Sequence, residues 1–250
     1  MPPTHKARQQ APTERALKMD RRRQPSIPSA AQLAVASAIG LTLSGGLTYF
    51  AAGDNTLPGD VAVARAVQGT SVPDFSWLAQ GVNWIGAGPQ LTVISLLIVT
   101  LLILHRTPHL ALFLLVATTL RSFNSILKAI AGSPRPSDAL ISVTERANGS
   151  GFPSGHAMGA MLVYGGFALL AECAIGRIRA RRFAQGCALL MVVLTGLSRV
   201  YTGAHWPSDV LGGFLWGLTL LLALLAVTER FGNRHSRPFV SKQPEPRRLP

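Results

Sequence analysis

This sequence has little charge and almost no cysteine. Only 14% of its 250 residues are charged, whereas 48% are hydrophobic. An average soluble domain carries about 25% charged residues, so the composition is typical of a protein that uses lipid as its solvent. The two cysteines, Cys173 and Cys187, fall in apolar runs and form neither a disulfide framework nor a zinc motif. The chain also lacks an internal repeat, a nucleotide-binding glycine loop and a dinucleotide fingerprint.

Long hydrophobic runs dominate what is present. Six of them approach or exceed the roughly 20 residues that a bilayer crossing needs: residues 31–52, 87–104, 110–131, 156–175, 183–201 and 208–227. A soluble helical bundle would need polar stripes at helical spacing, yet the segment LTVISLLIVTLLIL carries no charge on any side. The first run is too long for the core of a cleaved signal peptide. We therefore predict an all-α polytopic membrane bundle of six transmembrane helices over residues 29–229.

The chain has 24 Lys and Arg residues against 11 Asp and Glu residues. Most of these positive charges cluster in four segments. They precede the first run, separate the second from the third, separate the fourth from the fifth, and follow the sixth. All four segments fall on one face of a six-helix protein, and the positive-inside rule makes that face cytoplasmic. We expect a multi-pass protein of the cell (inner) membrane with basic, disordered, cytoplasmic tails at residues 1–28 and 230–250. This arrangement explains the net charge of +13 without a nucleic-acid partner.

The unusual polar residues of the predicted core gather at the opposite helix ends. Each of these residues also has a purely structural interpretation. A cation at a helix end can extend its charge to the membrane interface, a histidine can fill space in the core, and an aspartate can cap a helix N-terminus. Together they converge on one extracytoplasmic patch, and ionisable groups at membrane depth indicate a functional site. The patch consists of Lys128, Arg135, Ser154, Gly155, His156, Arg199, His205 and Asp209.

The composition of this patch predicts a phosphate site. Its three cations, Lys128, Arg135 and Arg199, have no carboxylate nearby in the predicted arrangement apart from Asp209. An arginine fork matches phosphate oxygens at two points, and lysine acts as a point charge. Ser154 and the following glycine add a hydroxyl and backbone N–H groups at a helix start, where phosphate is favoured.

The two histidines have separate predicted roles. The i to i+4 spacing lets Asp209 accept from one ring nitrogen of His205, which leaves the other nitrogen free to attack phosphorus. His156, on the opposite wall, is placed to protonate the departing oxygen. A zinc site of these three residues is the competing interpretation, but fixed cations nearby would repel the metal. We therefore expect neither a metal nor another cofactor.

Eleven residues in this order resemble the type-2 phosphatidic acid phosphatase family, which shares its core site with vanadium-dependent haloperoxidases. Lys128 is followed after six residues by Arg135-Pro136, then by PSGH at residues 153–156, and then by Ser198-Arg199. His205 and Asp209 complete the pattern at the family's spacings. The resemblance covers roughly residues 87–227. It implies hydrolysis of phosphate esters or anhydrides without a metal, through a phosphohistidine on His205.

The pattern leaves the substrate and two other functions open. Phosphatidate, phosphatidylglycerophosphate and undecaprenyl diphosphate all present the same head to the pocket. A vanadate-dependent haloperoxidase and a non-catalytic phospholipid-binding or transport protein are the alternatives. Arg121 binds a second phosphate or serves a structural role, and we favour the latter. Residues 73–86 predict a helix, with Trp77 and Trp84 beside an apolar face, that either lies in the membrane interface or packs as a loop helix without a role in substrate binding.

Overall fold

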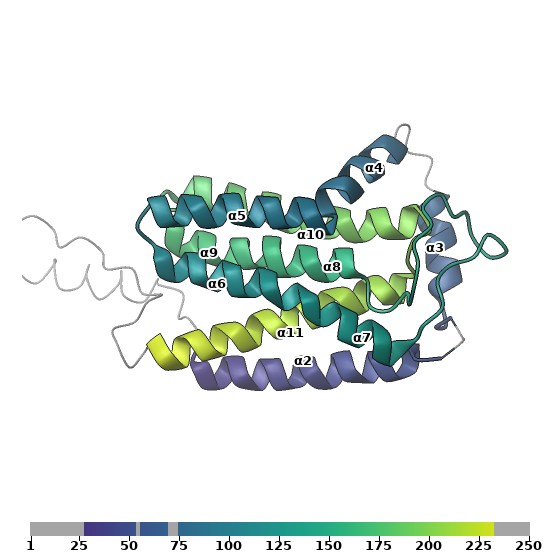
Figure 1. Cartoon of the computed structure of the whole chain (residues 1–250), viewed down its shortest axis with the longest axis horizontal. Coiled ribbons are helices and arrows are strands. Elements are labelled where there is room, and N and C mark those ends of the chain that lie inside the picture. The colour runs from purple at the N-terminus through teal and green to yellow at the C-terminus, as the bar shows by residue number, and fades with distance from the viewer. Residues whose placement is uncertain (1–27, 54–55, 70–74, 233–250) are drawn as a thin grey trace, which may run out of the picture.

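The computed structural model describes residues 28–53, 56–69 and 75–232, and this part of the chain is helical without strands. Helices α2, α5, α10 and α11 are single long elements, while two further rods are each built from three consecutive pieces (Figure 1). The elements are α2 (Ala30–Ala51), α3 (Asp60–Gln68), α4 (Phe75–Gly86), α5 (Gly88–Leu104), α6 (Pro108–Thr119), η1 (Leu120–Ser122), α7 (Phe123–Ala131), α8 (Gly155–Ala160), η2 (Met161–Gly165), α9 (Gly166–Ala174), α10 (Ile178–Tyr201) and α11 (Pro207–Gly232). The tails predicted to be disordered lie almost entirely outside the described residues.

The predicted membrane helices are confirmed to within a few residues. Five spans are long and apolar enough to cross a bilayer: Ala30–Ala51, Pro108–Ala131, Gly155–Ala174, Ile178–Tyr201 and Pro207–Arg230. A sixth candidate is a bent pair, in which Ser76–Gly86 meets Gly88–Leu104 at 63°. The short second run therefore corresponds to α5, and α4 precedes it at an angle.

Local sequence signals set several of the helix boundaries. Ser29 caps α2, because its side chain and that of Gln32 bond reciprocally to the two backbones. Pro108 and Pro207 open α6 and α11, at first-turn positions where a missing N–H costs nothing. Gly132 ends α7 with φ 59°, the left-handed conformation that glycine adopts most easily.

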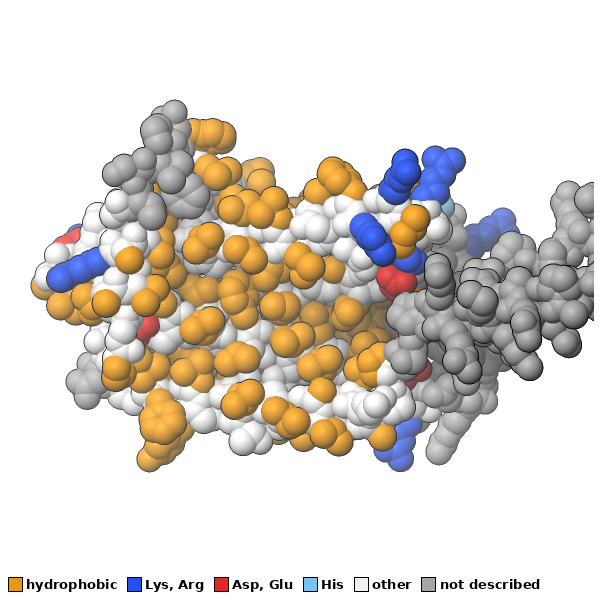
Figure 2. Space-filling view, turned by 180° about the vertical axis from the view of Figure 1, so that it is seen from behind, with side chains coloured by type: hydrophobic (Ala, Val, Ile, Leu, Met, Phe, Trp, Pro, Cys, Tyr) orange, Lys and Arg blue, Asp and Glu red, His pale blue; other side chains and the backbone are white. Residues whose placement is uncertain are grey.

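The flank of the bundle is apolar, as a bilayer requires. Hydrophobic side chains cover the middle of the face in Figure 2, and most charged side chains lie toward its two ends. The exposed large hydrophobics include Leu97, Leu101 and Leu104 on α5. Only 17% of the α2 span is buried within the chain, so most of this helix faces outward.

The two ends of the bundle differ in chemistry. One end carries the connections at residues 132–154 and 202–206 together with α3 (Figure 1). The opposite end carries the short connections at residues 105–107 and 175–177 and the end of α11. The arginines of the predicted basic face lie at this second end: Arg106, Arg177, Arg179, Arg181, Arg182 and Arg230. The site residues lie at or near the first end.

Candidate active site

The PSGH segment is fixed against the first turns of α11. The Ser154 backbone N–H donates to the Asp209 carbonyl at 2.9 Å, which joins the two segments main chain to main chain. Glycines on α11 make this approach possible: a Cβ at Gly212 would lie 2.2 Å from the Phe152 ring, and one at Gly213 would lie 2.6 Å from the Ser154 carbonyl oxygen. The close contact therefore fixes where the span Gly155–Ala174 begins.

A tight turn after α10 places His205. The Arg199 carbonyl accepts hydrogen bonds from the backbone N–H groups of Ala204 and His205, at 3.1 and 3.2 Å. Gly203 has φ 68°, and a Cβ there would lie 2.2 Å from the Ser142 carbonyl oxygen. Only glycine fits this position without movement of the backbone, because both its conformation and its neighbour oppose a side chain.

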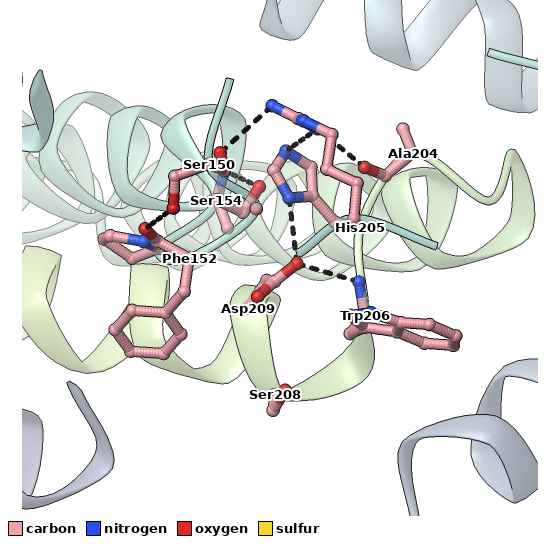
Figure 3. A network of polar contacts seen from close by, with 12 residues as sticks. Ser150, Phe152, Ser154, Ala204, His205, Trp206, Ser208 and Asp209 are labelled. Atoms are coloured by element: carbon pink, nitrogen blue, oxygen red, sulfur yellow. Dashed lines mark hydrogen bonds and ion pairs between the residues drawn. The ribbon is translucent and has the colours of Figure 1, made fainter. Parts of the chain in front are cut away.

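His205 and Asp209 form a buried pair at the centre of the site (Figure 3). His205 Nδ1 lies 3.2 Å from Asp209 Oδ2, and the two side chains are 3% and 1% exposed. The same carboxylate oxygen accepts from the Trp206 backbone N–H at 3.0 Å. Asp209 thus both caps α11 and holds the imidazole, so the structural and the functional interpretation of this residue are compatible.

The other ring nitrogen of His205 faces Arg135. His205 Nε2 lies 3.4 Å from Arg135 Nη1. A guanidinium has donors and no acceptor, so Nε2 must accept the hydrogen bond through its lone pair. Nδ1 therefore carries the ring proton and donates a hydrogen bond to Asp209. This tautomer leaves a nucleophilic lone pair directed at the nearest cation of the site.

Electrostatics keep this histidine neutral. Burial lowers the pKa of His205 well below its ordinary value, and the nearby positive charges of Arg199, Arg135 and Lys128 lower it further. The pKa of Arg135 is also lowered, chiefly by burial. A neutral imidazole is the form that can attack phosphorus.

The loop at residues 148–151 holds two of the predicted phosphate-binding cations. Arg135 donates to the carbonyl oxygens of Gly149 at 2.9 Å and Ala204 at 2.7 Å. Lys128 donates to the carbonyl of Ser150, which also accepts from Arg135 at 3.4 Å. Since backbone oxygens carry no net charge, these contacts do not neutralise either cation.

The third cation corrects one expectation. Arg199, which is 1% exposed, donates from Nη1 to Glu145 Oε1 at 2.7 Å. Asp209 is therefore not the only carboxylate near these cations. Glu145 lies in the irregular segment 132–154, where sequence spacing gives no geometry, and this is why the prediction missed it.

Glu145 also connects the site to α4. Asn83 on α4 donates from Nδ2 to Glu145 Oε2 at 2.7 Å and accepts from the Ser198 hydroxyl at 2.7 Å. Leu78, Val82 and Ile85 face inward to varying degrees on this helix, whereas Trp77 and Trp84 are each 66% exposed. The predicted amphipathic helix is present, and its polar contacts reach the neighbour of Arg199.

His156 lies at the bend between α4 and α5. A Cβ at Gly86 would be 3.4 Å from His156 Cδ2 and 3.2 Å from the Thr195 side chain. Ser154 caps the same span, accepting from the Ala157 N–H at 3.5 Å. The structure gathers the eight predicted residues at one end of the bundle, and their individual roles stay predictions. Within the described ranges, no three His, Cys, Asp or Glu side chains cluster as metal ligands would.

Comparison with known proteins agrees with this geometry. The family model of the PAP2 superfamily matches residues 109–232. Phosphatidylglycerophosphatase B of Bacillus subtilis (strain 168) is 31% identical over 173 residues, which cover 68% of this chain and 84% of the relative. The chain belongs to the PAP2 superfamily.

Solved structures share the fold of this PAP2 protein. The crystal structure of a transmembrane PAP2-type phosphatidylglycerolphosphate phosphatase from Bacillus subtilis aligns with a TM-score of 0.65 at 26% identity, over 80% of this chain and 98% of the other. Aquifex aeolicus LpxE aligns with a TM-score of 0.53 at 20% identity, over 68% and 96%, which supports the fold alone. The predicted family, the helical membrane fold and the activity class, a lipid phosphatase, are confirmed.

Proposed function

We propose that this PAP2 phosphatase hydrolyses the terminal phosphate of a membrane lipid through a phosphohistidine on His205, without a metal. The observation that carries the proposal is the position of the imidazole, with Nδ1 toward Asp209 at 3.2 Å and Nε2 toward Arg135 at 3.4 Å. A phosphoryl group bound by Arg135 would place its phosphorus next to the Nε2 lone pair. The relative's name makes phosphatidylglycerophosphate the first substrate to test.

In the first step, His205 Nε2 bonds to phosphorus and the bond from phosphorus to the leaving oxygen breaks. Asp209 stabilises the positive charge that develops on the ring. His156 gives its proton to the leaving oxygen, so the lipid departs as an alcohol, or as a lipid monophosphate if the substrate is a diphosphate. Lys128, Arg135, Arg199 and the Ser154-Gly155 segment neutralise the equatorial oxygens.

In the second step, water attacks the phosphohistidine. His156, now neutral, accepts a proton from this water, the phosphorus–nitrogen bond breaks, and the electron pair returns to Nε2. Inorganic phosphate leaves and both histidines regain their starting protonation. Two displacements at phosphorus give overall retention of configuration.

Rapid quench with lipid carrying a radiolabelled terminal phosphate tests the intermediate. We expect an acid-labile, base-stable label on the peptide that contains His205. His205→Gln should lose both label and turnover, and His105→Gln, at the opposite end of the bundle, is the matched control that should keep both. Inversion of configuration with a chiral substrate would exclude the two-step scheme.

We further propose that the site faces the extracytoplasmic side. The support is the separation of the bundle's ends, because the arginines at 106, 177–182 and 230 lie opposite the site residues and basic loops stay in the cytoplasm. A cysteine introduced at Ser137 should react with an impermeant maleimide on intact cells, and one at Arg179 should react only after permeabilisation. The reverse pattern would place the site in the cytoplasm.

A further inference from the structure

Arg121 is a cation within a membrane span that has no acidic partner among the described residues. It lies in η1, which interrupts the span Pro108–Ala131. Its guanidinium donates to the Gly88 carbonyl and to the Thr92 hydroxyl, each at 3.3 Å. These bonds are longer than the usual 2.9–3.0 Å, and the buried Nε has no hydrogen-bond partner within the described chain.

A groove between α5 and α6 opens beside this arginine. It has a volume of about 510 Å³ and is lined by Arg121 together with Gly88, Thr92, Leu96, Leu115 and Thr119. Leu96 and Leu115 are 50% and 42% exposed, so the groove lies on the flank that faces lipid. Pockets of this size accommodate small ligands, and the lining combines Arg121 and five hydroxyl-bearing residues with the apolar side chains of Leu96, Val99 and Leu115.

The groove adjoins the leaving-group side of the active site. Gly86 borders His156, and two residues later a Cβ at Gly88 would lie 3.4 Å from Arg121 Nη2. From the other side, a Cβ at Gly159, one turn after His156, would lie 3.0 Å from Arg121 Nε. The histidine that protonates the leaving oxygen and Arg121 therefore flank the same bend between α4 and α5.

We propose that this groove holds the lipid part of the substrate and that Arg121 binds a second phosphate carried by the leaving group. This inference rests on the proposed function, because His156 marks the lipid side only if it is the acid of that reaction. A groove with this arginine would favour lipids such as phosphatidylglycerophosphate, whose leaving group keeps a phosphodiester. Phosphatidate, whose leaving group is an uncharged diacylglycerol, lacks the matching anion.

Charge complementarity favours this occupant over a purely structural role. A charge inside a membrane span is costly, and a neutral amide would serve as well for bonds to one carbonyl and one hydroxyl. Lys128 lies seven residues further along the same span, about 10 Å along the axis. The two cations are therefore spaced to hold two phosphates of one lipid, one at the catalytic site and one in the groove.

The test compares kcat/KM for phosphatidylglycerophosphate and phosphatidate of identical acyl chains, using the purified full-length protein in neutral vesicles. Arg121→Gln should lower the ratio of the two values roughly ten- to hundredfold, as expected for the loss of a charged hydrogen bond. Arg121→Lys should recover much of the ratio, because it restores the charge. Thr100→Val, which makes the same kind of change on α5 at a position that does not line the groove, should leave the ratio close to that of the wild type.

Other outcomes separate the alternatives. Equal losses on both lipids in Arg121→Gln would mean that the residue only holds the bend, and would overturn this inference alone. Stimulation of phosphatidate turnover by added phosphatidylglycerol, present in the wild type and lost in Arg121→Gln, would overturn it in favour of a bystander lipid. Absence of phosphate release from both lipids by the wild type would overturn the proposed function and this inference with it.

Discussion

Arg199 Nη1 donates a 2.7 Å hydrogen bond to Glu145 Oε1, so a cation predicted to bind phosphate already has an anionic neighbour. The side chain of Glu145 is 39% exposed, whereas that of Arg199 is 2% exposed. The carboxylate is therefore the more solvent-accessible partner of the pair. A phosphoryl group that reaches Arg199 must compete with it.

The first prediction concerns this competition. Glu145→Gln should tighten inhibition by orthovanadate several-fold, because removing one negative charge near a phosphate-like anion removes a repulsion that water only partly screens. The turnover number should fall at the same time, since Arg199 loses part of its orientation. The measurement is the inhibition constant of vanadate, taken alongside kcat.

A matched control exists at the opposite end of the bundle. Glu172 pairs with Arg181 at 3.0 Å, so Glu172→Gln makes the same chemical change far from the site. It should alter neither constant. Unchanged or weaker vanadate inhibition in Glu145→Gln would mean that this carboxylate only orients Arg199.

The second prediction concerns the turn that carries His205. Gly203→Ala should lower the free energy of unfolding by more than about 2 kcal/mol and lower kcat strongly. The left-handed backbone is unfavourable for alanine, and the alanine Cβ would lie 2.2 Å from the Ser142 carbonyl oxygen. Gly186→Ala is the control, since a Cβ at this position in α10 meets no atom within 4 Å. It should stabilise the protein by about 0.5–1 kcal/mol. Thermal unfolding in detergent and steady-state kinetics measure both effects.

The third prediction is a pH dependence of stability. The pKa of His205 is lowered on folding, chiefly by burial, so the unfolded chain takes up a proton near pH 6.5 while the folded chain does not. The free energy of unfolding should therefore fall as the pH drops below about 6.5, by on the order of 1 kcal/mol at pH 5.5 from this residue alone. His205→Gln lacks this contribution and should lose stability less steeply. Parallel curves for the two proteins between pH 7.5 and 5.5 would contradict a neutral, buried His205.

The fourth prediction concerns metal dependence. In the proposed mechanism, the cations at positions 128, 135 and 199 would supply the positive charge that a metal gives other phosphatases. Exhaustive treatment with EDTA should therefore leave phosphate release nearly intact. Loss of activity that zinc or magnesium restores would contradict the assignment of these cations.

Much of the fold could be predicted because lipid imposes simple requirements on sequence. Uncharged runs of about 20 residues identify the spans, and the arginine clusters identify one end. The contact between His205 and Asp209 could be predicted as well, because the two residues lie four positions apart at the start of one helix. These features depend on local sequence, where spacing determines geometry.

The remaining features depend on contacts between distant segments. Glu145 reaches Arg199 from an irregular loop, and Asn83 reaches Glu145 from a helix 62 residues earlier. No periodicity predicts either contact. The helix that carries Lys128 is interrupted at η1, where Arg121 and Ser122 stand in the run 110–131, but polar residues in a helical run do not by themselves predict a change of helix type. The groove beside Arg121 likewise depends on the packing of α5 against α6, which local sequence does not predict.

The bond from the Ser154 N–H to the Asp209 carbonyl does not depend on side-chain chemistry. It ties the segment that bears His156 to the first turn of α11 through main-chain atoms that every amino acid possesses. The distance between these two segments is therefore set by the backbone, whichever side chains stand at positions 154 and 209.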